Sequence, residues 1–218
     1  MTFGTRMAIV SPAILVLLIG RPPSASVTQQ TDDRDVVILS PDERDGRLTP
    51  TREAITFWNQ TLSDLKLRPR LLETEIIVAS PSSRALETYA RHISQRAGRF
   101  APRGADPNAP RELTTLGSDI VLLLSKQEIF SFAWPLADPT RFFIAIQTDR
   151  VQPLNHPNVS RNVIAHELGH ALGLRHNGNP TTLMCGPCDQ VVFRSEAPVF
   201  FPLTPGDRAR LLERYLAR

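Results

Sequence analysis

Apolar residues recur along this chain at two spacings, and the helical spacing marks three segments. The first follows Thr49 and Pro50, which we interpret as an N-cap and a first-turn proline. Its apolar positions are Ile55, Trp58, Leu62 and Leu65, and we assign Trp58 to the core. Residues 82–97 repeat the pattern through Leu86, Tyr89, Ala90 and Ile93. A final helix is predicted to start at residues 204–207, with the apolar face Ala209, Leu211, Leu212, Tyr215 and Leu216.

Short unbroken apolar runs form the second pattern, which is typical of strands buried on both faces. We expect strands within residues 36–39, 75–79, 118–125 and 141–149. Residues 98–111 contain three prolines and two glycines without periodicity, so we predict an exposed loop there. No repeat or change of composition divides the rest of the chain, which indicates one domain.

The N-terminus has the composition of a secretory signal. Arg6 precedes thirteen mostly apolar residues, 7–19, and small residues follow within 22–26. We therefore expect a signal peptide at 1–26, a short polar segment at 27–35 and the domain at 36–218. An uncleaved membrane anchor is the alternative, although a transmembrane helix needs about 20 apolar residues. The predicted location is secreted or extracytoplasmic.

Charge argues against two classes of partner. The formal net charge is +3, from 25 basic and 22 acidic residues, and the only lysines are Lys66 and Lys126. Because no basic run occurs, we expect neither a nucleic-acid partner nor stable membrane association once the signal is removed. We expect a monomer.

The candidate chemistry lies in residues 163–176, where three of the five histidines fall within eleven positions. His166 and His170 are four residues apart, so on a helix both imidazoles project from one face, about 6 Å apart along the axis. Glu167 is one step round from the first histidine, where it can deprotonate a water without displacing a ligand. This spacing indicates a zinc site with a glutamate general base.

His176 is the third candidate ligand, but a continuing helix would carry it away from the other two. Gly173 accepts a positive φ at little cost, so the helix can stop there and the chain can turn back. Three protein ligands leave the fourth position open, as in catalytic zinc sites. The alternative is that these are ordinary hydrogen-bonded core histidines.

These residues resemble the metzincin metalloproteases, whose His-Glu-x-x-His-x-x-Gly-x-x-His pattern is matched from His166 to His176. Thr181-Thr182-Leu183-Met184 follows at the spacing of the matrixin methionine turn, although Met184 could be an ordinary core methionine. The resemblance implies an α+β fold with a twisted mixed sheet, two to three long helices, an active-site helix and a methionine turn. It also implies one catalytic Zn²⁺, whereas calcium ligands are not evident in the sequence.

The resemblance further predicts how a peptide substrate would bind. The strand before the active-site helix, residues 143–148, should be the sheet edge that pairs with substrate. Residues 132–137 should form the rim of the cleft, with Trp134 either on the rim or buried. The apolar runs 191–193 and 199–202 should wall a pocket for an apolar side chain.

Cys185 and Cys188 flank Gly186-Pro187 just after the predicted methionine turn. In a secreted chain, two lone cysteines most simply pair as a structural disulfide. Free thiols or a labile switch, and redox catalysis of the thioredoxin kind, are the alternatives. Matrixins, which this chain resembles, are commonly held latent by a propeptide cysteine that binds the zinc. No cysteine precedes Cys185, so that mechanism is not open to this chain.

The sequence as a whole predicts a secreted zinc endopeptidase acting on peptides or proteins. Glu167 would be the catalytic base, and His166, His170 and His176 the metal ligands. The competing class is a secreted zinc-binding or interaction module without turnover.

Overall fold

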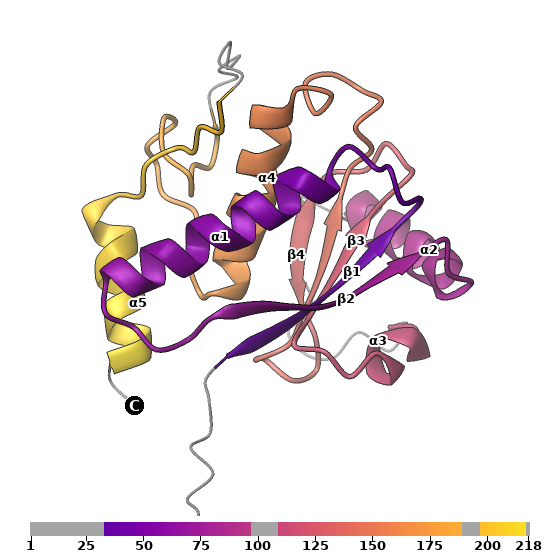
Figure 1. The fold of residues 1–218 in the computed structure, drawn as a ribbon, viewed down its shortest axis with the longest axis horizontal. Helices are drawn as coiled ribbons and strands as arrows, with labels where there is room; N and C mark the ends of the chain where they lie inside the picture. The colour runs from indigo at the N-terminus through magenta and orange to yellow at the C-terminus, as the bar shows by residue number, and fades with distance from the viewer. Residues whose placement is uncertain (1–32, 97–108, 189–196, 217–218) are drawn as a thin grey trace, which may run out of the picture. The chain divides into compact units, whose positions relative to one another are not determined.

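A computed structural model describes residues 33–96, 109–188 and 197–216 (Figure 1). The strands are β1 (Arg34–Ser40), β2 (Leu71–Val78), β3 (Ile120–Leu124), β4 (Phe132–Pro135) and β5 (Phe142–Ile146). The helices are α1 (Leu48–Asp64), α2 (Ser82–Arg96), α3 (Arg111–Thr115), α4 (Pro157–Ala171) and α5 (Pro205–Leu216).

The five strands form one mixed sheet in the order β2-β1-β3-β5-β4. Four strands are parallel, and only β4 runs antiparallel to its neighbour β5. The expected twisted mixed sheet is therefore present. Since α1 and α2 connect parallel strands, the N-terminal half alternates strand and helix, which the α+β description does not convey.

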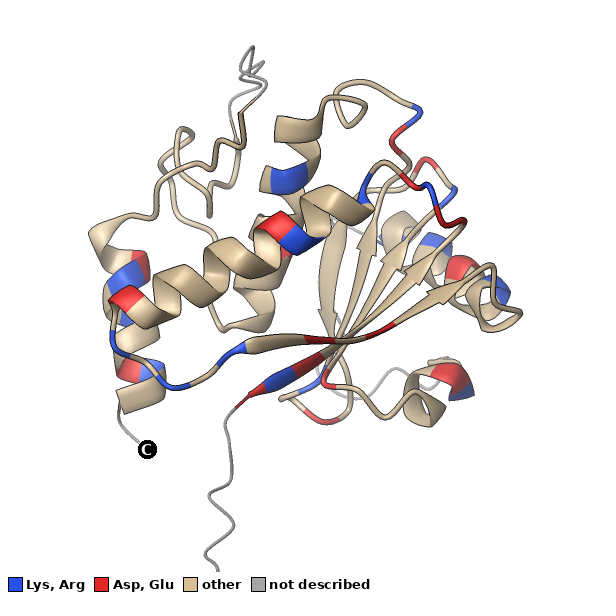
Figure 2. Ribbon diagram, in the orientation of Figure 1, with Lys and Arg blue, Asp and Glu red and all other residues tan. Residues whose placement is uncertain are grey.

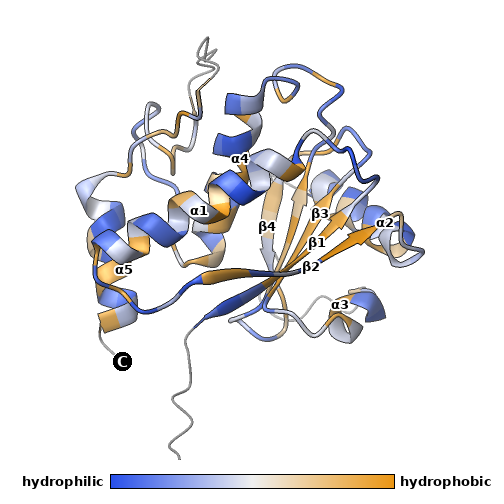
Figure 3. Ribbon diagram, in the orientation of Figure 1, coloured by the Kyte–Doolittle hydropathy of each residue, from blue (hydrophilic) through white to orange (hydrophobic). Residues whose placement is uncertain are grey.

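Helices cover both faces of the sheet, which explains why the strands are continuous apolar runs (Figure 3). Alternate residues of β3 face opposite sides: Ile120 and Leu122 pack with α1 and α4, whereas Val121 and Leu123 pack with α2. Neither β3, β4 nor β5 contains a charged residue, so charges are confined to helices, loops and the two strands β1 and β2 (Figure 2).

One buried cation joins the carboxyl ends of two strands to the start of α1. The guanidinium of Arg47 donates to the carbonyl oxygens of Ser125 and Gln147, each at 2.8 Å, and pairs with Asp45 at 2.6 Å. Its charge is thus neutralised and its donors are used, as a buried guanidinium requires. This anchors the strand ends beside which α4 begins.

Most predicted elements are present, but several bounds were wrong. α1 begins at Leu48 with Arg47 as N-cap, so Thr49 is not the cap, although Pro50 lies in the first turn. β2 starts at Leu71, four residues before the predicted strand, and Arg111 begins the short helix α3 instead of ending a loop. The start of α5 was right, because the Thr204 hydroxyl caps the Asp207 N–H at 3.0 Å.

Several predictions lie outside the described residues: the signal peptide, most of the polar segment 27–35, most of the loop 98–111 and the apolar run 191–193. Among the helices that are described, none combines the length and the apolar character needed to cross a bilayer.

Candidate metal centre

α4 carries the first two candidate ligands and has a well-defined start. His156 is its N-cap, and the ring Nδ1 accepts the N–H of Asn158 at 3.2 Å, while Pro157 occupies the first turn. A proline there has no N–H to leave unpaired. His156, which the sequence left without a role, is therefore a capping residue.

The end of α4 allows the third histidine to return. The helix ends at Ala171, and Gly173 has φ +96°, a conformation that favours glycine. The N–H of Leu174 bonds back to the carbonyl of Gly169 at 3.0 Å, which closes the turn. His176 follows on a loop that comes back beside the helix.

The structure brings the three histidines together in one cluster. The Nε2 atoms of His166, His170 and His176 are each 3.1 Å from the other two. Tetrahedral coordination with Zn–N bonds of about 2.0–2.1 Å separates neighbouring nitrogens by roughly 3.3–3.4 Å. The observed separations are within a few tenths of an ångström of that value.

Hydrogen bonds at the opposite ring nitrogens decide the protonation of two of these rings. His166 Nδ1 is 2.6 Å from the carbonyl oxygen of Leu183, and His170 Nδ1 is 3.0 Å from that of Leu174. A carbonyl only accepts, so each Nδ1 carries the proton and each Nε2 presents a lone pair. Two lone pairs 3.1 Å apart have no proton to share, and a cation between them would stabilise the arrangement.

Burial further favours neutral rings. It lowers the pKa of His166 to about 4, with repulsion from His170 adding to the shift and the Leu183 bond opposing it. Burial also lowers the pKa of His170. Neutral imidazoles are the form that binds transition metals. The donor set, its spacing and its protonation therefore fit a zinc ion.

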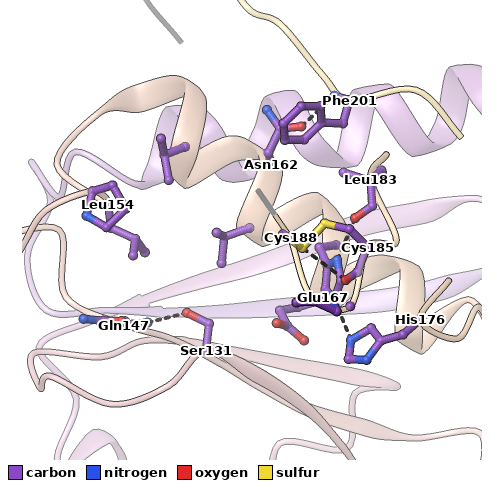
Figure 4. Close-up of a pocket in the computed structure, with 16 residues that line it drawn as sticks. Ser131, Gln147, Leu154, Asn162, Glu167, His176, Leu183, Cys185, Cys188 and Phe201 are labelled. Carbon is purple, nitrogen blue, oxygen red and sulfur yellow. Dashed lines mark hydrogen bonds between the residues drawn. A yellow bond between two sulfur atoms is a disulfide. The ribbon is translucent and has the colours of Figure 1, made fainter. Parts of the chain in front are cut away.

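Glu167 lies beside the cluster, and its side chain points to the same side of the pocket as His176 (Figure 4). It is 7% exposed. Burial raises the pKa of its carboxyl to about 8, against the opposing effect of a bond from the Ala133 N–H of β4. The backbone of β4 thus orients this carboxylate. No pattern in the sequence predicts this contact between Ala133 and Glu167.

Met184 is fully buried and packs against α4 at Gly169. A Cβ on Gly169 would lie 2.6 Å from Met184 Sδ and 2.9 Å from the Trp58 ring. The Trp58 N–H, in turn, donates to the carbonyl of Ala165 at 2.8 Å. Glycine is needed here so that α1, α4 and the Met184 segment can meet, a role that sequence reasoning missed.

The loop that carries His176 is held from two sides. The N–H of Asn177 donates to the carbonyl of Met184 at 2.7 Å, and its side chain donates to Asp207 of α5 at 3.0 Å. A Cβ on Gly186 would lie 2.7 Å from His176 Cγ, so the backbone of residue 186 packs directly on the ring. These contacts position the ligand farthest along the chain.

Cys185 and Cys188 form a disulfide beside the cluster. Two groups among the described residues are close enough to hold a metal: the three histidines, and His166 with the two cysteines. Because paired cysteines have no thiolate to offer, the histidine group is the candidate centre.

A pocket of about 480 Å³ opens beside His166, Glu167 and His176 (Figure 4). Its other walls are mostly apolar, and among the residues that the structure describes no lysine or arginine lines it. The apolar lining includes Pro153, Leu154, Val159, Val163, Leu183 and Phe201. Such a pocket suits an apolar side chain, as expected.

The structure corrects the expected edge strand of the cleft and distinguishes the two alternatives for Trp134. β5 lies between β3 and β4, so residues 143–148 are not the sheet edge; β4 is. Residues 132–135 have no alternating pattern, so the sequence analysis did not predict the strand β4. Trp134 is half-buried, packs against the α2 side of the core and does not line this pocket, which favours the packing alternative over the rim.

Comparisons with known proteins do not assign this chain to a family. No family model matches it, and no curated protein matches it. Two similar solved structures are archaemetzincin from Methanopyrus kandleri, at TM-score 0.46 and 15% identity, and a chaperone–substrate complex, at TM-score 0.44 and 20% identity. The first match covers 88% of this chain and 100% of that one, and the second 71% and 27%. With both TM-scores below 0.5, the chemistry rests on the geometry of the site itself.

Proposed function

We propose that this protein is a zinc-dependent endopeptidase of the metzincin kind. The observation that carries the proposal is the triangle of Nε2 atoms, each 3.1 Å from the others, with Glu167 and an apolar pocket on its open side. A hydrogen-bonded core cluster would not need two adjacent lone pairs, and a structural zinc would have a fourth protein ligand.

Each residue has a role in peptide hydrolysis. A zinc ion held by the three histidines would supply a Lewis acid that polarises the scissile carbonyl and activates water. Glu167 takes the proton from the attacking water and passes it to the leaving amine. The raised pKa of Glu167 suits the transfer of the proton to the leaving amine. A nearby cation would lower that pKa, because it stabilises the carboxylate.

Substrate binding uses the sheet and the pocket. β4 ends the sheet, so an extended peptide can add to it as a further strand, which gives backbone bonds independent of sequence. The pocket beside Glu167 accepts an apolar side chain on the leaving-group side. The proposal includes secretion directed by residues 1–26 and action as a monomer.

The test is incubation of the purified protein, with one equivalent of zinc, with a diverse peptide library. Cleavage should occur, should depend on zinc and should favour peptides with an apolar residue after the scissile bond. A chelator-treated sample is the control. If the zinc-loaded protein cleaves no peptide, the competing zinc-binding module without turnover is supported instead.

A further inference from the structure

Two asparagines lie buried on one face of α4, four residues apart. Asn158 is 0% exposed and Asn162 is 6% exposed. A buried amide without partners is costly, so these side chains must be hydrogen-bonded to something. Within α4, Asn158 Oδ1 accepts from Arg161 and Asn162 Nδ2 donates to the Asn158 carbonyl. The other partners lie about 40 residues further along the chain, in the segment 197–201.

The two amides bond alternate backbone groups of that segment. Asn158 Oδ1 accepts the N–H of Val199 at 3.0 Å, and its Nδ2 donates to the carbonyl of Ala197 at 3.3 Å. Asn162 Nδ2 donates to the carbonyl of Val199 at 2.7 Å, and its Oδ1 accepts the N–H of Phe201 at 2.7 Å. Because an N–H only donates and a carbonyl only accepts, these partners also fix which way each amide points.

This is the bonding pattern that a neighbouring β-strand would provide. Residues 197, 199 and 201 present their backbone groups to α4, as alternate residues of a strand do. On the other side, the N–H of Leu183 donates to the carbonyl of Pro202 at 2.9 Å. The helix thus acts as a surrogate strand through two side chains.

The register of the segment decides which aromatic ring reaches the pocket. Phe200 stacks on Phe57 of α1, with ring centroids 4.4 Å apart, whereas Phe201 lines the pocket beside Asn162 (Figure 4). Val199, Phe200 and Phe201 are all apolar, so burial alone would tolerate a one-residue slip. The asparagine bonds distinguish one register from the other.

We propose that Asn162, supported by Asn158, is a positioning residue that holds Phe201 in the pocket wall and so sets the side-chain selectivity of the site. The proposal extends the proposed function and rests on it, because side-chain selectivity has a meaning only if the site cleaves peptides. The substrates concerned are peptides with an apolar residue after the scissile bond. Asn162 itself also lines the pocket, and the proposed effect is exerted through Phe201 and not through the reacting atoms.

The first test compares Asn162→Ala with Asn59→Ala. Asn59 is a matched control, because its amide brackets the backbone of Leu71 in the same way, at 2.8 and 2.9 Å, and it does not line the pocket. We measure kcat/KM on three peptides that differ only in having Ala, Leu or Phe after the scissile bond. Asn162→Ala should change the ratios among them by at least about tenfold, the lower end of the discrimination that one methylene group gives in an apolar pocket. Asn59→Ala should leave the ratios unchanged.

The second test keeps the proposal open to refutation even if Asn162→Ala folds poorly. Phe201→Ala should change the same ratios, whereas Phe200→Ala should not. In the Asn162→Ala background, Phe201→Ala should add little, because the ring has already lost its position. Equal effects of Phe200→Ala and Phe201→Ala, or unchanged ratios in Asn162→Ala, would overturn the proposal.

A third readout does not require turnover. Hydrogen exchange should show slow Val199 and Phe201 amides in the wild type, with the Phe201 amide at least about tenfold faster in Asn162→Ala. Zinc content should be the same in both proteins. If wild type cleaves no peptide while the exchange pattern holds, the proposed function fails and the register stands. Fast exchange at Phe201 in wild type would refute the register itself.

Discussion

The metal cluster and the pocket wall lie side by side but are built in different ways. The three histidines come from eleven consecutive positions, and one helix with its terminal turn brings them together. The wall at Phe201 comes from a segment without regular secondary structure, which two asparagines of the same helix hold in place.

This difference indicates which part can vary without loss of the other. Helix geometry alone sets the spacing of His166 and His170, so the metal centre tolerates change in the segment 197–201. The pocket wall depends on side-chain bonds between residues far apart in sequence. We therefore expect mutations in the cluster to abolish chemistry and mutations in the wall to alter selectivity or stability.

The largest effect should follow loss of a ligand. In His176→Ala, zinc affinity should fall by more than about 100-fold, because even the loss of a residue that only hydrogen-bonds a metal ligand typically costs 10–100-fold. Metal analysis of dialysed protein measures this, with His92→Ala, an exposed histidine of α2, as the control. Full zinc occupancy in His176→Ala would show that His176 is not a ligand. The metal centre would then not be built from the three histidines of one helix and its terminal turn.

Loss of the general base should separate chemistry from metal binding. Glu167→Ala should remain folded and keep its zinc, while kcat/KM falls by at least about a thousandfold, within the range typical of general acid–base catalysis. No tyrosine can take over: Tyr89 packs on the α2 side, and the Tyr215 hydroxyl lies 3.3 Å from the carbonyl of Leu172. Peptide cleavage by the zinc-loaded variant at the wild-type rate would contradict the mechanism.

Gly169 lies where α4 packs closely on Trp58 of α1 and on Met184. Gly169→Ala should lower the free energy of unfolding by about 1–3 kcal/mol, since its Cβ would overlap Met184 and Trp58. Urea denaturation measures this loss. Gly178→Ala is the matched control, because a Cβ at Gly178 meets no atom within 4 Å. Equal urea midpoints for Gly169→Ala and Gly178→Ala would show that the close approach of Met184 and Trp58 to Gly169 does not contribute to stability.

A stability effect of similar size should come from the disulfide on the pocket side. Native protein should have no alkylatable thiol, and reduction should expose two, Cys185 and Cys188. The closed loop has only four residues, so the chain-entropy model gives a stabilisation of about 2 kcal/mol. Thiol titration and urea denaturation with and without reductant measure both values. Two reactive thiols in native protein would favour the free-thiol alternative.

The site was easier to predict from the sequence than the cleft around it. The spacing of His166, His170 and His176, with Gly173 between, is local information that one helix and one turn convert directly into a cluster. The strands at β1, β3 and β5 were equally clear, because burial on both faces leaves unbroken apolar runs. β4 was not, because four residues at the edge of a sheet carry no distinct pattern.

What the sequence determined by itself is the set of groups that one helix and the turn that ends it can bring together: the three imidazoles and the adjacent carboxylate. Tertiary structure alone decided that β4 is the edge strand, that the N–H of Ala133 orients Glu167, and that Gly169 admits Met184. It also decided that Phe201, and not Phe200, faces the pocket. Each of these depends on contacts between residues distant along the chain, whose pairing follows from packing and hydrogen-bond satisfaction and not from local spacing.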